Sequence, residues 1–277
     1  MEKKHSVKDF NIIDLMILLG VKPENAKIHL AVRSTTCPLD EYLAGTFEKW
    51  QSIQTRRNFE RKWIISLIQT SANNVWMFAG IYESIGAQFD KSLDTYKYRT
   101  NLTNKAETLS GRLFVKFKRP GRASYLNAEN YIHDIEIYEI TPEKLKYPDF
   151  SSYRFVDLSW KNLETIISNE ISSWKNALSC VSGIYLIADR KSGQMYVGSA
   201  NGKDGLWGRW KDYVGTFHGG NQTFKKLLAN KGTRPFLDFQ FSILETHSLE
   251  IPDPELINHE NRWKERLMSR TFGFNEN

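Results

Sequence analysis

The spacing of apolar residues changes character along the chain. Over residues 8–32 and 47–69, apolar side chains recur every three or four positions, which is the period of an amphipathic helix. Gly20 is placed to end a first helix, and Pro23 to begin a second that runs to about residue 32. These stretches are therefore predicted to be helical.

Between residues 75 and 140 the pattern becomes that of short strands. Four segments are rich in β-branched and aromatic residues and are separated by Gly, Asn, Asp and Pro: 75–82, 95–102, 112–118 and 133–140. Within 112–118, Leu113, Val115 and Phe117 alternate with largely basic positions, as in a strand with one buried face. We predict a small antiparallel sheet or barrel here, so that residues 1–140 form a helical plus antiparallel β module for DNA recognition.

Residues 141–179 are predicted to be a connector followed by a linking helix from 159 to about 178. From residue 180 the expected order is strand, strand, helix, helix, strand, helix. The six elements are 181–188, 194–199, 205–214, 222–230, a strand within 236–245, and 254–269. This pattern predicts an α+β protein whose last part, residues 180–277, is a compact β-β-α-α-β-α sandwich.

Composition narrows the class of protein. The chain has 277 residues, 40% of them hydrophobic, and 38 Lys+Arg against 32 Asp+Glu give a net charge of +6. This rules out wholesale disorder and permits a polyanionic partner without requiring one.

Cys37 and Cys180 cannot make a four-cysteine zinc site. No segment approaches the roughly 18 apolar residues that cross a bilayer, so we expect no membrane and a soluble, cytoplasmic protein.

The sequence does not predict a metal site built from histidines. His259-Glu260 begins like the helix of a zinc protease, but Trp263 occupies the position of the second histidine. A single histidine in that frame cannot hold zinc. The six histidines of the chain are not expected to form a ligand cluster.

Two tyrosine motifs draw attention to the last part of the chain. Gly183-Ile184-Tyr185 is followed by Tyr196-Val197-Gly198, then Arg209 in a helix, Glu260 on a later helix and a terminal Asn275. Two strand tyrosines alone would be ordinary β-formers. In this order, and on this pattern of elements, the set resembles the GIY-YIG nuclease superfamily over about residues 180–277.

The resemblance implies a metal-dependent endonuclease. Glu260 matches the family's metal-binding carboxylate, which would hold Mg²⁺ or Mn²⁺. Arg209 matches the arginine that pairs with the scissile phosphate. Cleavage would leave a 3′-hydroxyl and a 5′-phosphate.

The resemblance also gives the remaining catalytic candidates. Tyr185 is expected to activate or position water, which as a base requires its pKa to be lowered by the metal, Arg209 or a lysine. Tyr196 would assist in orienting water or phosphate. Tyr213 stands where family members have His or Tyr, so which tyrosine handles the proton stays open. Asn275 is expected to hold the tail near the site, and an ordinary turn remains its alternative.

Basic side chains are the candidates for contacts with nucleic acid. Those with specific predictions are Lys203, Lys211, Lys116, Lys118, Arg119 and Arg122. A solvated loop or a strand kept soluble by lysines is the alternative for each. Other cations near the motifs would attract a nucleic-acid backbone without regard to sequence: Lys225, Lys226, Lys231, Arg234, Arg262, Lys264, Arg266 and Arg270.

The leading hypothesis is therefore a DNA endonuclease, in restriction or defence, DNA repair or mobile-element biology. A homodimer would suit double-strand breaks, because one site cuts one strand at a time. The alternative is a nucleic-acid-binding protein that keeps the nuclease fold without cutting.

Overall fold

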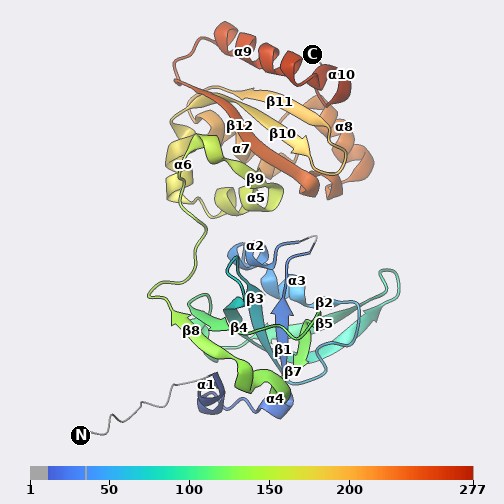
Figure 1. The fold of residues 1–277 in the computed structure, drawn as a ribbon. Helices are drawn as coiled ribbons and strands as arrows, with labels where there is room; N and C mark the ends of the chain where they lie inside the picture. The colour runs from blue at the N-terminus through green and yellow to red at the C-terminus, as the bar shows by residue number, and fades with distance from the viewer. Residues whose placement is uncertain (1–11, 35, 277) are drawn as a thin grey trace, which may run out of the picture. The chain divides into compact units, whose positions relative to one another are not determined.

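The computed structural model describes residues 12–34 and 36–276, and the chain divides after Lys146 into two compact units (Figure 1). Each unit has its own sheet and its own hydrophobic core. Among the described residues, no helix is both long and apolar enough to cross a membrane. The α+β class is confirmed.

The first unit is built on an eight-stranded sheet. Its strands are β1 (Ala26–Ala31), β2 (Ile53–Gln54), β3 (Trp63–Gln69), β4 (Val75–Asp90), β5 (Thr95–Leu102), β6 (Leu113–Lys116), β7 (Tyr125–Asn127) and β8 (Glu136–Ile140). The main order is β2-β5-β4-β3-β1-β7, while β6 pairs with β4 and β8. The short helices are α1 (Ile12–Leu18), α2 (Pro38–Leu43), α3 (Phe47–Gln51) and α4 (Ala128–Tyr131). The sheet is mixed rather than purely antiparallel, because β1 and β3 run parallel.

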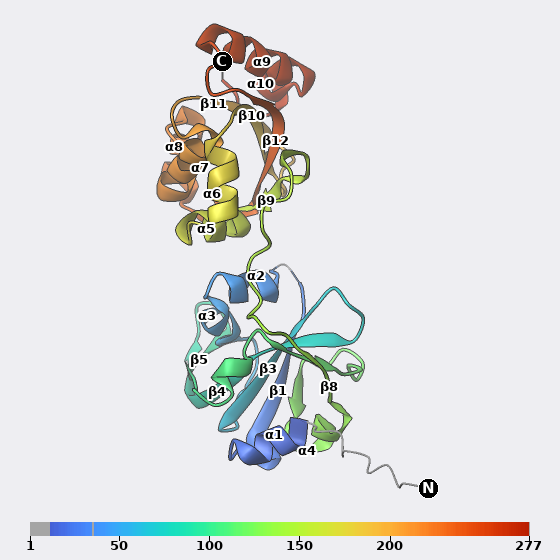
Figure 2. The same ribbon diagram turned by 90° about the vertical axis from the view of Figure 1, so that its left-hand side faces the viewer.

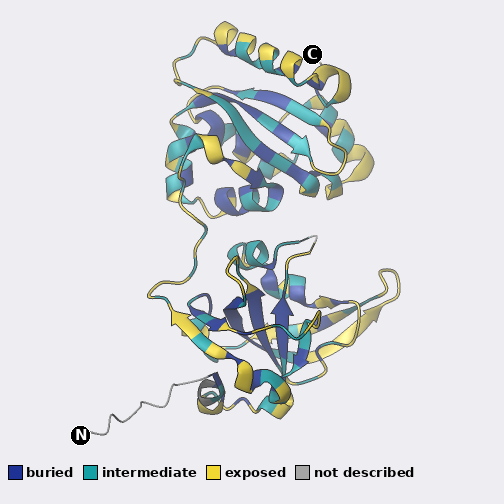
Figure 3. Ribbon diagram, viewed as in Figure 1, coloured by how far each residue is buried: buried dark blue, intermediate teal, exposed yellow. Residues whose placement is uncertain are grey.

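Two predicted helices of the first unit are wrong. Most of 23–32 is the strand β1, and 47–69 holds only the short helix α3 before β2 and β3. The strands β1 and β3 lie in the interior of the sheet and are buried along most of their length (Figure 3). A strand covered on both faces is a nearly continuous apolar run, which spacing alone cannot distinguish from a buried helix. The prediction at Gly20 holds, because this residue ends α1 with a left-handed φ of 65°.

The second unit contains a four-stranded antiparallel sheet in the order β11-β10-β12-β9. Its strands are β9 (Asp157–Ser159), β10 (Ser182–Asp189), β11 (Met195–Ala200) and β12 (Phe239–His247). Its helices are α5 (Trp160–Ser168), α6 (Ser172–Ser179), α7 (Gly205–Thr216), α8 (Gln222–Lys231), α9 (Asp253–Arg266) and α10 (Ser269–Phe272). From β10 onward the predicted β-β-α-α-β-α order is confirmed.

Residues 147–179 pack into the second unit. The expected single helix over 159–178 is two helices, α5 and α6, separated at Glu170, whose φ is 46°. Both contribute buried side chains to the core that also holds α7 and α8. Helix α9 covers the other face of the sheet through Leu256, which packs with Ile184 and Val197 (Figure 2).

A β-bulge decides which side chains reach α9. The register between β10 and β12 shifts at Ile184/Tyr185, so that Ile184 lies opposite Glu245 and Tyr185 lies opposite Ile243. Leu244 is the extra residue. Opposed residues share a face of the sheet, and therefore Glu245 points to the α9 side while Ile243 packs with the α5–α8 core.

Gly183 is required by this bulge. A Cβ atom at Gly183 would lie 2.5 Å from the backbone oxygen of Glu245, which belongs to the paired strand and has little room to move. We expect Gly183→Ala to lower the free energy of unfolding by about 1–3 kcal/mol, as overpacking does. Gly215→Ala is the matched control, because nothing lies within 4 Å of that position on α7. Chemical denaturation measures both, and equal losses of stability would contradict the steric argument.

Candidate active site

Two tyrosines from different elements form a buried pair. Tyr185 on β10 and Tyr213 on α7 are each 1% exposed, and their hydroxyl oxygens are 3.0 Å apart. Gly198 lies directly opposite Tyr185 on β11. A Cβ atom at Gly198 would come within 2.5 Å of the Tyr185 hydroxyl oxygen. The glycine of the second motif therefore makes room for the phenol of the first.

The electrostatic environment of this phenol pair is the reverse of that expected for a base. Burial, reinforced by neighbouring phenols, raises the pKa of both Tyr185 and Tyr213 well above the ordinary value. Arg209 opposes this shift without cancelling it. Of the groups that a base role at Tyr185 would require, Arg209 lowers the pKa of this phenol, but burial outweighs it and the net shift is upward. Both phenols are neutral at pH 7 and can donate and accept hydrogen bonds.

Arg209 lies on α7, one helical turn before Tyr213, and is half-buried. Its Nη1 donates to the backbone oxygen of Gly219 at 3.4 Å. Burial lowers the pKa of this guanidinium, but the nearby Tyr185, Tyr213 and other groups raise it, and the net shift is upward. In the part of the chain that the structure describes, no carboxylate lies within ion-pair distance of Arg209. Among the described residues Arg209 therefore has no ion-pair partner, although the nearby Asp212 contributes to its raised pKa.

Tyr196 lies beside the phenol pair on β11. Its ring centroid is 6.4 Å from that of Tyr185 and 5.2 Å from that of Phe224 on α8. The side chain is half-buried, in contrast to Tyr185. Tyr196 is therefore the more exposed of the two residues.

Glu260 approaches the same strand from the opposite face. It lies on α9, where its Oε2 accepts a hydrogen bond from the Ser199 hydroxyl and its Oε1 is 2.7 Å from the Lys264 Nζ. Gly198 and Ser199 are consecutive residues of β11, an edge strand of the sheet. The charge of Glu260 is one of the causes of the raised Tyr185 pKa. Phenols and carboxylate are therefore on different faces of the sheet but meet at one segment of its edge.

Asn275 fastens the end of the described chain to β11. Its Oδ1 accepts from the Val197 N–H and its Nδ2 donates to the Val197 carbonyl, both at 2.9 Å. The Phe274 N–H also donates to the Met195 carbonyl at 2.8 Å. Asn275 thus holds the tail against residues 195–197 and positions Tyr196 through the backbone. These contacts stop short of Gly198 and Ser199.

The predicted nucleic-acid contacts are scattered. Lys203 and Lys211 are exposed on the second unit, and Lys116, Lys118 and Arg122 on the first. Arg119 donates to the Ala123 carbonyl and the Ser124 hydroxyl, both at 2.8 Å, and so stabilises its own turn. Lys264, which was expected to attract a nucleic-acid backbone, is instead buried against Glu260. The sequence could have indicated this ion pair, because residues four apart on a helix are neighbours.

Two histidines and a glutamate lie together in the second unit, an arrangement that the sequence did not predict. Glu245 Oε2 lies 2.7 Å from His259 Nδ1 and 3.2 Å from His247 Nε2. The residues come from β12 and α9, so no local motif contains all three. We call them the histidine–glutamate cluster.

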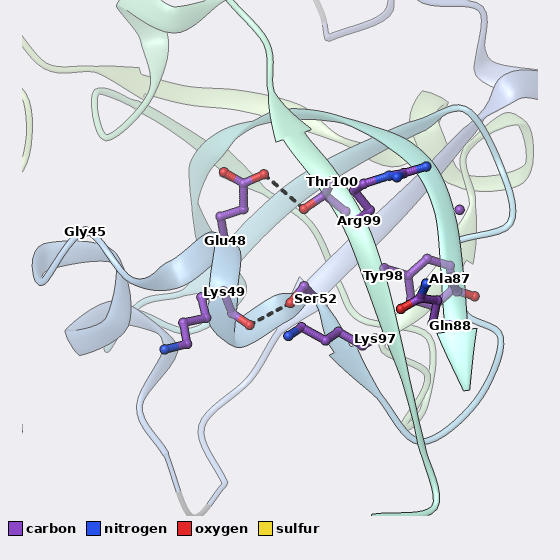
Figure 4. A pocket seen from close by; sticks show the side chains of 11 residues that line it. Gly45, Glu48, Lys49, Ser52, Ala87, Gln88, Lys97, Tyr98, Arg99 and Thr100 are labelled. Carbon is purple, nitrogen blue, oxygen red and sulfur yellow. Dashed lines mark hydrogen bonds between the residues drawn. The ribbon is translucent and has the colours of Figure 1, made fainter. Parts of the chain in front are cut away.

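A cavity of about 710 Å³ lies in the first unit, between α3 and the β4–β5 hairpin (Figure 4). Lys49, Lys97 and Arg99 line it together with Glu48, which accepts a hydrogen bond from the Thr100 hydroxyl at 3.0 Å. Cations outnumber carboxylates on its wall, which favours an anionic ligand. None of the predicted basic residues of the first unit lines this cavity.

Comparisons with known proteins concern about a third of the chain. No protein-family model and no curated protein matches it. A mutant form of the catalytic domain of intron endonuclease I-TevI is 28% identical, over 35% of this chain and 94% of that one, with a TM-score of 0.27. The catalytic domain of homing endonuclease I-TevI is 32% identical, over 34% and 96%, with a TM-score of 0.25.

The raised pKa values of the phenol pair predict alkaline sensitivity. Unfolded tyrosine has a pKa of about 10, so above that pH the unfolded chain releases protons that folded Tyr185 and Tyr213 retain. Stability is therefore unaffected below pH about 10 and falls as the pH rises above it. We expect the double variant Tyr185→Phe/Tyr213→Phe to lose stability less steeply in this range.

Denaturation curves at a series of alkaline pH values measure the slope, and phenolate absorbance follows the titration. Tyr138→Phe is the control, because Tyr138 is 58% exposed. Parallel slopes for the wild type and the double variant would contradict the assignment.

Proposed function

We propose that the second unit is a metal-dependent endonuclease of the GIY-YIG type that hydrolyses phosphodiester bonds in DNA. One observation carries this proposal. The phenols of Tyr185 and Tyr213 pair beside Gly198, and Arg209 lies one helical turn from Tyr213 on α7. Glu260 accepts a hydrogen bond from Ser199, the residue that follows Gly198. The other elements of the unit serve to hold these groups in place.

Each group answers a need of phosphodiester cleavage. The planar guanidinium of Arg209 can pair with two phosphate oxygens and stabilise the charge that grows on them. Burial raises the pKa of Tyr185 and Tyr213, which favours a role in ordering water or phosphate by hydrogen bonds. Tyr196, more exposed, contacts the same ligand. The phenols thus act as fixed dipoles in a dry environment, where such groups need no reorganisation.

The donor set at Glu260 suits a hard cation. One carboxylate beside the Ser199 hydroxyl, completed by water and phosphate oxygens, is typical of Mg²⁺ or Mn²⁺ sites. When bound, the ion would polarise a phosphate oxygen and favour a hydroxide nucleophile. Lys264 holds Oε1 of the same carboxylate, so its ammonium competes with the cation for that oxygen.

That ion pair also favours a second candidate function. The buried Lys264 neutralises the Glu260 carboxylate and occupies one of its oxygens. A binding protein that no longer cuts DNA could keep Glu260 for this ion pair alone. Such a protein would bind DNA in the presence or absence of Mg²⁺ and give no cleavage products. The cleavage assay separates the two.

Glu260→Gln and Arg209→Ala test the proposal directly. We expect each to lower the rate of DNA cleavage in Mg²⁺ by at least about 100-fold, as loss of one stabilising group in an active site does. Glu255→Gln, an exposed glutamate on the same helix, should cut at the wild-type rate. Sequencing of product ends from modified, unmodified and branched DNA identifies the substrate. Cleavage that persists in both site variants would sink the proposal.

We further propose that the first unit contributes to the choice of target, in a restriction or defence enzyme that acts as a dimer. Lys116 at the end of β6 and Lys118, two residues after it, are both exposed. Lys116→Ala/Lys118→Ala should weaken DNA binding and flatten the plot of log affinity against log salt by about 0.9 per lost phosphate contact. Lys62→Ala is the control, since that lysine pairs with Glu83 at 3.6 Å. An unchanged salt slope in the double variant would contradict a contact there.

A further inference from the structure

The histidine–glutamate cluster presents three metal-ligating atoms to one another. Glu245 Oε2 lies between His259 Nδ1 at 2.7 Å and His247 Nε2 at 3.2 Å. All three donor atoms lie within 4.8 Å of one another, and the two imidazole rings are 4.5 Å apart between centroids. Among the described residues this is the grouping of His, Cys, Asp and Glu whose geometry fits an ion.

The fold brings these residues together by a specific device. Glu245 and His247 are two apart on β12 and so share a face of the strand. Without the bulge at Leu244 they would continue the alternation of Phe241 and Ile243 toward the opposite core. The bulge turns them to the face covered by α9, where His259 lies.

We propose that Glu245, His247 and His259 bind a transition-metal ion of the Zn²⁺ class, at a site separate from the carboxylate of Glu260. Two imidazoles and one carboxylate, with a fourth position left for water, are a common zinc donor set. Ligands about 2.0–2.1 Å from a tetrahedral ion lie roughly 3.4 Å from one another. To reach that value, the 3.2 Å separation of Glu245 from His247 needs to open slightly and the 2.7 Å separation from His259 by somewhat more than half an ångström.

The site is open enough to load. The side chains of His247, His259 and Glu245 are 18%, 24% and 29% exposed, so an ion can enter from solvent and keep a water ligand. Nitrogen donors select the cation, because Mg²⁺ prefers oxygen ligands and imidazole suits zinc and its neighbours. The two sites of this unit would therefore take different metals.

The proposed zinc site joins the helix α9 to the strand β12. His259 immediately precedes Glu260 on α9, whereas Glu245 and His247 end β12. An ion held by all three would fasten α9 to β12 next to the carboxylate at the edge of β11. We infer that the ion stabilises the folded unit and fixes the helix that carries Glu260.

Metal binding by the untagged full-length chain tests the proposal. Zn²⁺ is titrated against a chromophoric chelator, and Co²⁺ absorption reports the coordination number. We expect one Zn²⁺ per chain, a four-coordinate Co²⁺ spectrum, and affinity at least about 100-fold weaker in His247→Ala, His259→Ala and Glu245→Gln, since even groups that only support a ligand cost 10–100-fold. His133→Ala, an exposed histidine of the first unit, should bind as the wild type does.

Two further variants exclude other ligands. Cys37→Ser/Cys180→Ser should keep full affinity, which rules out the free thiols. Glu260→Gln should keep zinc binding, and its loss there would show that the sites are not separate. Circular dichroism checks that each variant is folded, and Glu245→Gln keeps the shape of the side chain.

A thermal shift supplies a second measurement that does not depend on nuclease activity. Zn²⁺ should raise the melting temperature of the wild type and leave that of Glu245→Gln unchanged, because an ion that binds only the folded state stabilises it. If the wild type binds no Zn²⁺, or if the cluster variants bind it equally well, the three residues are a hydrogen-bonded group only and the proposal is wrong.

Discussion

The second unit depends on the close approach of one phenol to one strand. Tyr185 reaches its partner Tyr213 only because Gly198, opposite it on β11, has no side chain to occupy the space of the hydroxyl. The same contact fixes the separation of α7 from the edge of the sheet, since Tyr213 and Arg209 share that helix. Asn275 then holds β11 from its outer side through both polar atoms of Val197. Packing, rather than a network of surface charges, sets the geometry of the candidate site.

Burial determines the chemistry available to these groups. A phenol removed from water keeps its proton, and a guanidinium beside several phenols keeps its charge. Glu260 and Lys264 are largely buried together, and such a pair is tolerated because each ion compensates the desolvation of the other. The proposed mechanism therefore assigns hydrogen bonding to the tyrosines and charge to Arg209 and Glu260. A cation that binds Glu260 must displace part of an existing interaction.

Two donor sets of different chemistry lie on the α9 face of the sheet. Glu260 contacts the Ser199 hydroxyl and the Lys264 ammonium, whereas Glu245 is flanked by two imidazoles at the end of β12. Both sets use α9, so its placement on the sheet affects the candidate catalytic carboxylate and the proposed zinc site together. The bulge at Leu244 is the local irregularity that makes this possible.

Local pattern was sufficient for the order of the elements from β10 onward. Strand alternation, Asn221 as the N-cap of α8, and the motifs at Gly183–Tyr185 and Tyr196–Gly198 are all readable from neighbouring residues. The central strands β1 and β3 were not readable, because a strand buried on both faces loses the alternation that distinguishes it from a helix. The sequence also did not predict the ion pair of Lys264 with Glu260, the raised pKa of Tyr185, or the contact between His247 and His259. Each of these features depends on which side chains are buried away from water and on which residues from distant parts of the chain come into contact. Only the tertiary structure decides both.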